Sequence, residues 1–272
     1  MRNSGFLARS GLFSNAGSTA LGAAYWAFVL YLFAPLTVMM LMSFKDANFI
    51  SFPINSWTLG WYGQVIQDKQ FLAAFGYSVL IAVASTLAAT IIGVWIALLI
   101  EAEGIWMRTV IFALACLPAV VPGMISAISL RIFVRTIDLQ TGTAAIILGH
   151  TIHAVPFVVV MVLTRLRAMP RSLVDAARDL GADNVVAFFR VTLPFLMPAI
   201  VGGMIFCALL SIDDFVRTFF LGGYQATLPM LIFAKIQGGM SPEINAMATL
   251  ILLVTAAVGL YAEYLTRRAR TR

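Results

Sequence analysis

The chain has 272 residues, of which 61% are hydrophobic and only 11% are charged, with a formal net charge of +6. A soluble domain carries about a quarter of charged residues, so this composition excludes an ordinary soluble protein and indicates a polytopic membrane protein. The positive charge does not indicate a nucleic-acid partner, because the basic residues gather beside apolar segments, as membrane topology requires.

Apolar segments long enough to cross a bilayer recur along the chain. About 20 apolar residues in a helix span the hydrocarbon core. The fold class expected is therefore all-α, with six transmembrane helices. In chain order we expect them at residues 20–42, 72–100, 109–134, 142–163, 195–212 and 244–265. The third is interrupted by Pro118, Pro122 and Gly123, which free backbone carbonyls and predict a break or hinge near mid-membrane.

The distribution of arginine predicts the orientation. With six spans, the arginine-rich loops and both chain ends fall on one side, which should be the cytoplasm. We divide the chain into a cytoplasmic N-terminal tail (1–19), a first span with a periplasmic loop (20–71), a five-span core (72–265) and a basic cytoplasmic tail (266–272). The expected location is the bacterial inner membrane, since the first apolar run is too long for the core of a cleaved signal peptide.

A polar stretch at 165–194 separates the fourth and fifth spans. Ser172 followed by Asp175 has the spacing of a capping box, and Leu173, Ala176, Ala177 and Leu180 have the spacing of one helical face. Gly181 suits the residue that ends a helix. Asp183 or Asn184 can cap a second short helix through Phe188 and Phe189, before Pro194 opens the fifth span. The pattern alone fits a hairpin on the lipid surface or a knob that docks on a cytoplasmic partner.

The same stretch resembles the signature of permeases from binding-protein-dependent ABC importers. That pattern is E-A-A, three residues, G, nine residues, I-x-L-P. The chain has Asp175-Ala176-Ala177, Gly181 and then Val191-Thr192-Leu193-Pro194 at this spacing, with Asp in place of Glu and Val in place of Ile. Further segments resemble the second permease of spermidine/putrescine importers: 124–130, 149–160, 210–216, 227–233 and 241–254.

The resemblance implies a mechanism and partners. The 165–194 loop would be a coupling helix that seats in an ATPase subunit. The partners would be two ATPase subunits, a second related permease and a periplasmic binding protein, in membrane lipid. ATP and Mg would be held by the ATPase, so this chain would be no enzyme and would carry no cofactor. The residues expected to make the coupling contact are Ser172, Asp175, Ala176, Ala177, Leu180, Gly181, Asp183, Phe188, Leu193 and Pro194.

Charged residues near the outer end of the fifth span are candidates for the solute pathway. Asp213 and Asp214 are carboxylates at membrane depth, which indicates function, and they suit an ammonium group. The alternative is an ion pair with Arg217, four residues after Asp213, or with Arg131 or Arg135. Those three arginines instead suit a carboxylate or phosphonate, so an opine-like, amino-acid-like or phosphonate solute stays open beside a polyamine.

Other readings rest on few residues. His150 and His153 are one turn apart, but no carboxylate completes a metal site, and hydrogen-bonded packing is the simpler interpretation. An intramembrane enzyme would have only these histidines and the adjacent Asp213 and Asp214, which point about 100° apart on a helix. A passive channel would not need the capped cytoplasmic element.

Overall fold

The part of the chain that the structure describes folds almost entirely into helices. The computed structural model describes residues 15–47, 53–239 and 241–270. Within these ranges the only strand-like pairing is an isolated bridge between Lys45 and Trp57. The helices are, in chain order, α1 (Asn15–Met42), α2 (Gly60–Gln67), α3 (Lys69–Ala102), α4 (Ile105–Val120), α5 (Gly123–Thr136), α6 (Thr143–Arg167), α7 (Arg171–Asp179), α8 (Asn184–Ala187), a π-helical turn η1 (Phe188–Thr192), α9 (Leu193–Ile212), α10 (Phe215–Leu221), α11 (Leu228–Gln237) and α12 (Pro242–Arg270).

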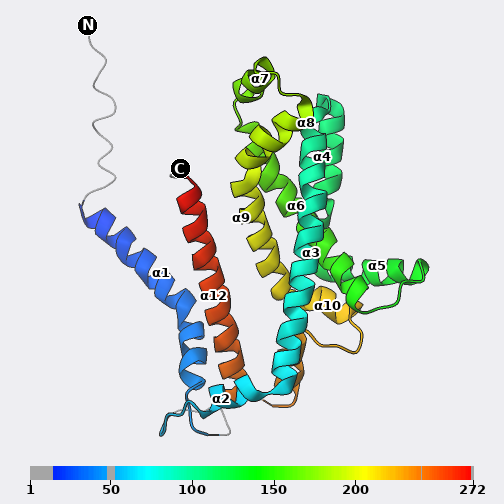
Figure 1. The fold of residues 1–272 in the computed structure, drawn as a ribbon. Coiled ribbons are helices and arrows are strands. Elements are labelled where there is room, and N and C mark those ends of the chain that lie inside the picture. The colour runs from blue at the N-terminus through cyan, green and yellow to red at the C-terminus, as the bar shows by residue number, and fades with distance from the viewer. Residues whose placement is uncertain (1–14, 48–52, 240, 271–272) are drawn as a thin grey trace.

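The predicted spans are confirmed, apart from the geometry of the third and the start of the fifth, which runs as one helix from Asn184 to Ile212 and not from residue 195. In the described part of the chain, 5 helices are long and apolar enough to cross a membrane, and α4 with α5 would make a sixth. This pair bends by 104° between Val120 and Gly123, so α5 turns away from the bundle (Figure 1). Pro122 has no N–H with which to continue the α4 ladder, which explains the predicted break.

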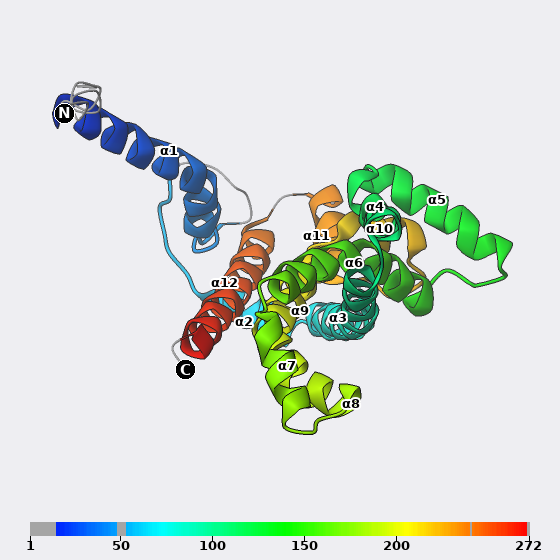
Figure 2. The ribbon, with the colours of Figure 1, turned by 90° about the horizontal axis from the view of Figure 1, so that it is seen from above.

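The core lies where α3, α6 and α9 run side by side (Figure 2). Val158 and Val159 of α6, Ala89 and Ala97 of α3, and Leu196 of α9 are fully buried there. Small residues on α3 let its backbone approach α6 closely, as in other membrane helix pairs. By contrast, α1 packs mainly against α12 and is exposed along most of its length.

The two ends of the bundle differ. The start of α1, the end of α12 and the α7–α8 element lie at one end, whereas α2 lies at the other (Figure 1). At the α2 end, the Lys235 ammonium lies 2.7 Å from Glu243 Oε1 and 3.3 Å from Asp68 Oδ2. This triad joins α11 to the starts of α3 and α12. Glu243 lies in the first turn of α12, where its carboxylate accepts a hydrogen bond from Lys235 Nζ.

Candidate functional site

The α7–α8 element stands at the end of the bundle, and its first helix starts earlier than predicted. Pro170 is the N-terminal flanking residue of α7 and no side chain caps the helix. The predicted capping box at Ser172 and Asp175 is therefore wrong, because Ser172 lies inside the first turn, where it cannot act as the cap. Asp175 instead lies 3.9 Å from Arg178 on the exposed surface.

The turn that joins α7 to α8 matches the prediction. Gly181 has φ +87, which favours glycine. The amide of Gly181 donates to Arg178 O (2.8 Å) and that of Ala182 to Ala177 O (3.0 Å), the hydrogen bonds of a glycine-terminated helix. Asp183 caps α8 by accepting from the amide of Val186, and Arg178 Nη2 donates to Asn184 Oδ1 at 3.0 Å. These bonds hold α7 and α8 together as one unit.

Several large apolar residues of this unit are exposed, although Ala187 of α8 is buried. No residue of α7 is buried, and Leu180 is 89% exposed. Leu173, Val185 and Phe189 are exposed as well, while Phe188 is half-buried and packs edge-on against Phe189. An exposed apolar patch on a polar loop is typical of a protein-binding surface. Leu193 and Pro194 lie in the first turn of α9, at the base of the unit.

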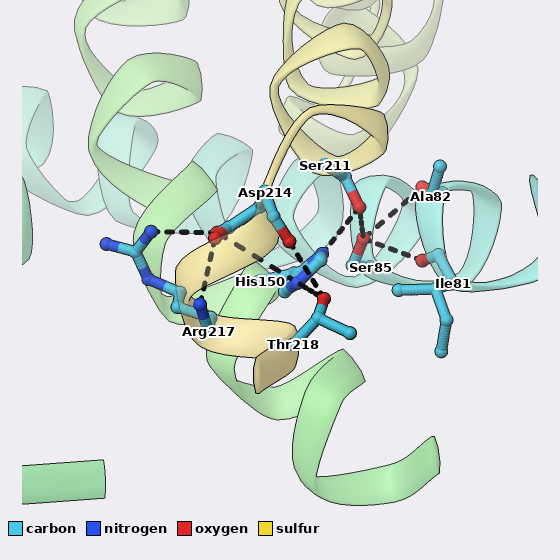
Figure 3. A network of polar contacts seen from close by, with 8 residues as sticks. All are labelled: Ile81, Ala82, Ser85, His150, Ser211, Asp214, Arg217 and Thr218. Atoms are coloured by element: carbon cyan, nitrogen blue, oxygen red, sulfur yellow. Dashed lines mark hydrogen bonds and ion pairs between the residues drawn. The ribbon is translucent and has the colours of Figure 1, made fainter. Parts of the chain in front are cut away.

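At the opposite end of α9, a buried ion pair occupies the turn into α10 (Figure 3). Asp214 caps α10, accepting from the Arg217 amide at 3.0 Å, and its second oxygen accepts from Arg217 Nη1 at 2.7 Å. Both side chains are buried. Arg217 thus forms an ion pair, as the alternative interpretation expects, but its partner is Asp214 and not Asp213. The break before α10 removes the i, i+4 helical spacing between Asp213 and Arg217.

Four polar residues on α3, α6, α9 and α10 extend the network around this pair (Figure 3). His150 Nδ1 shares a hydrogen bond with Ser211 Oγ (2.7 Å) and Nε2 shares one with Thr218 Oγ1 (3.2 Å). His150 Nε2 also lies 3.9 Å from Asp214 Oδ2, and Ser211 Oγ lies 3.1 Å from Ser85 Oγ. The network joins α3, α6, α9 and α10, which agrees with the packing interpretation of His150. Sequence reasoning missed Ser85, Ser211 and Thr218, whose only signal is a hydroxyl near a break in an apolar helix.

Asp213 differs from its neighbour Asp214 in exposure and in pairing. Its side chain is exposed and forms no ion pair with any residue that the structure describes. It lines a cavity of about 830 Å³ between α1, α9, α10, α11 and α12. Apolar side chains form most of the walls, including Phe215 and Phe233, whose ring centroids lie 4.8 Å apart. Among the described residues of this lining, Asp213 alone is charged.

The three arginines do not converge on Asp213. Arg131 Nη1 donates to the Phe220 carbonyl at 2.7 Å, which ties α5 to α10. Arg217 forms its ion pair with Asp214. Arg135 lines a separate cavity of about 790 Å³ with Asp138 and Tyr224. The arginines in the sequence suggest a pocket for an anionic solute, but their positions in the structure do not form one beside Asp213.

A metal centre has no basis in the described ranges, where no group of three His, Cys, Asp or Glu side chains converges. His153 Nδ1 is buried and has no hydrogen-bond partner among those residues, and its ring packs edge-on against Phe157. Asp213 and Asp214 face different surroundings, so they do not form the facing pair of carboxylates that an aspartyl protease needs.

Comparison with known proteins gives a consistent result. Residues 89–271 match the model of the family described as "Binding-protein-dependent transport system inner membrane component". The putrescine transport system permease protein PotI of Escherichia coli is 36% identical over 247 residues, covering 88% of each chain. The spermidine/putrescine permease PotC of the same species is 31% identical over 243 residues, covering 89% of this chain and 91% of PotC.

Solved structures share the fold at lower identity. A subunit of a bacterial ABC transporter that imports the acidic polysaccharide alginate superposes with a TM-score of 0.73 at 18% identity, covering 92% of this chain and 94% of that one. A subunit of the methionine transporter MetNI, in an inward-facing conformation, gives 0.63 at 19% identity over 73% and 95% of the two chains.

Proposed function

The chain belongs to the family of binding-protein-dependent transport system inner membrane components, and from this premise we propose how it works. It is a permease subunit of an ABC importer, a transport protein and not itself an enzyme, and its solute is a polyamine. We assign the α7–α8 unit to the contact with an ATPase and Asp213 to the solute pathway.

We infer the solute class from the relatives PotI and PotC, and the cavity at Asp213 supports this inference. Linear polyamines alternate ammonium groups with methylene chains. An unpaired carboxylate attracts an ammonium group, neighbouring aromatic faces attract the same cation, and apolar walls accept the methylenes. Asp213, Phe215 and Phe233 offer this combination in one cavity.

The alternative of an anionic solute depends on free arginines, and two of the three arginines in this region are engaged. Arg217 is neutralised by Asp214, and Arg131 is bound to a backbone carbonyl of α10. The buried Arg217 guanidinium is therefore not free to form the bidentate contact that would favour a carboxylate or phosphonate, and Arg131 has its Nη1 engaged.

The uncovered α7–α8 unit supports coupling to an ATPase. A partner that hydrolyses ATP with Mg would cover Leu180, Val185 and Phe189, and its closure would push on α9. Two ATPase copies, a second related permease and a periplasmic binding protein complete the proposed assembly. The binding protein would deliver the polyamine at the α2 end of the bundle.

Uptake of labelled putrescine by the reconstituted complex tests the pathway role. We expect Asp213→Asn to raise the half-saturating concentration by about tenfold or more, the cost of one charge-assisted contact. Asp138→Asn is the matched control, because Asp138 lines the other cavity, and it should transport normally. An Asp213→Asn complex with unchanged half-saturation would remove Asp213 from the pathway, and saturable uptake of a carboxylate solute in its place would overturn the polyamine assignment.

Co-purification with the ATPase tests the docking role. We expect Leu180→Glu to abolish association, since a buried unpaired carboxylate would be left at the contact. Leu59→Glu is the control, an equally apolar residue that is 69% exposed at the α2 end. Retained association of the Leu180 variant would contradict the assignment of this surface.

A further inference from the structure

The connection between α7–α8 and the membrane bundle contains a widened helical turn. The segment Asn184–Ile212 runs as one helix, but residues Phe188–Thr192 form the π turn η1. The amide of Leu193 donates to Phe188 O, five residues earlier, whereas an α-helix bonds to the fourth. Such a turn accommodates one extra residue, and single π turns of this kind occur often at functional sites.

Proline explains why the widening occurs here. Pro194 has no N–H, so the carbonyl of Arg190 cannot receive the α-helical bond that residue 194 would supply. Pro198 repeats the loss one turn further along α9. The helix therefore lacks two backbone hydrogen bonds near the point where it leaves the α7–α8 unit, although it stays continuous.

The two sides of the π turn are held differently. On the α9 side, the Arg165 guanidinium lies 4.0 Å from the centroid of the Phe195 ring, and its Nε donates to Phe195 O at 3.1 Å. Leu196 is fully buried in the core. On the other side, Arg178 and the Gly181 turn bind α7 to α8, and no residue of α7 is buried.

The π turn η1 therefore lies between two segments that are each held by their own contacts, the α7–α8 unit and α9. We infer that η1 is a joint through which α7–α8 changes its angle relative to α9, with Pro194 and Arg165 as the positioning residues of that joint. A helix advances about 100° per residue. Conversion of the π turn to an α turn therefore rotates the docking unit about the axis of α9 while Arg165 keeps the start of α9 against α6.

The inference rests on the proposed contact between α7–α8 and an ATPase, and it adds a specific consequence. The joint lets the unit stay seated on a moving ATPase while α9 turns within the bundle. A helix without the extra residue would transmit the same contact with a fixed angle. Docking would survive, but ATP hydrolysis would no longer be matched to solute movement.

Deletion of Arg190 tests the joint directly. Removing one residue from the π turn restores α-helical geometry and leaves the faces of α8 and α9 in their present directions. We expect normal association with the ATPase and continued ATP hydrolysis, while putrescine imported per ATP falls by about tenfold. The matched control is Arg190→Ala, which removes only an exposed side chain and should keep the wild-type ratio.

A second variant covers the case in which the deletion prevents assembly. Pro194→Ala restores the missing N–H without changing the chain length, and it should lower the same ratio in the same direction. A wild-type ratio in the deletion variant, or in Pro194→Ala when the deletion does not assemble, would overturn the joint. An equal loss in Arg190→Ala would also overturn it, because the side chain would then be responsible. Failure of the docking proposal is separate, since it would appear as an ATPase that binds Leu180→Glu normally.

Discussion

Asp213 and Asp214 are neighbours in the chain, yet they occupy different chemical surroundings. The helix ends at Ile212, so Asp214 becomes the cap of α10 and is neutralised by Arg217. Asp213 stays exposed in an apolar cavity. A buried ion pair that loses one partner leaves an uncompensated charge, which is strongly destabilising. At the scale of single residues, Asp214 therefore holds the turn, and Asp213 is the residue that we propose for contact with the solute.

Gly93 is a second position where one side chain matters. A Cβ at this position would lie 2.7 Å from Val158 Cβ, so α3 and α6 would have to separate. We expect Gly93→Ala to lower the free energy of unfolding by about 1–3 kcal/mol, measured by thermal unfolding in detergent. Gly76→Ala in the same helix has no atom within 4 Å of the added group and should be neutral or stabilising. Equal melting of both variants would contradict this close packing.

At the scale of elements, the triad of Lys235, Asp68 and Glu243 ties α11 to α3 and α12. Partial burial acts to raise the pKa of Asp68, but the Gln70 amide and the Lys235 ammonium outweigh it and hold this pKa below 3.8. Burial acts to lower the pKa of Lys235, but Glu243 and Asp68 outweigh it and raise this pKa above 10.5. Both charged forms are therefore favoured by folding.

The pH dependence of stability follows from these directions. Because the Asp68 pKa is lower in the folded state, its contribution is complete above 3.8 and is lost as pH falls through the folded value. The Lys235 contribution is complete below 10.5 and is lost as pH rises through the folded value. We expect Lys235→Met to lower stability at neutral pH by about 1 kcal/mol or less and to flatten both limbs of a melting-temperature profile. Lys69→Met, an exposed neighbour of Asp68, should keep both limbs.

Elements also show what the sequence could predict and what it could not. Hydrophobicity locates the spans, because long apolar runs have few alternatives in a bilayer. Gly181 and Asp183 are predictable, since their roles depend on local backbone chemistry. The start of α7 differs from the prediction because Pro170, and not Ser172, is the residue that flanks the helix. The π turn has no local signal beyond Pro194, and the His150 network depends on residues that only the fold brings together.

At the scale of the whole molecule, the positions of the chain ends predict a topology. The α7–α8 unit shares its end of the bundle with the start of α1 and the end of α12 (Figure 1). We expect a single cysteine at Asp179 to react with a membrane-impermeant reagent only after the inner membrane is opened. A cysteine at Leu59 should react in intact spheroplasts. Cys116 and Cys207 would first be replaced by serine, and the opposite labelling pattern would invert the predicted orientation.

The shortness of α4 has a consequence for the surrounding lipid. Its 16 residues reach about 24 Å, whereas the hydrocarbon core of a bilayer measures about 30 Å. The 104° bend prevents α5 from supplying the remainder, and α4 buries none of its own side chains. Acyl chains beside this helix must therefore shorten or tilt to meet it, at a cost that grows with every ångström of mismatch. We therefore expect longer-chain lipids to increase the mismatch at the α4–α5 corner.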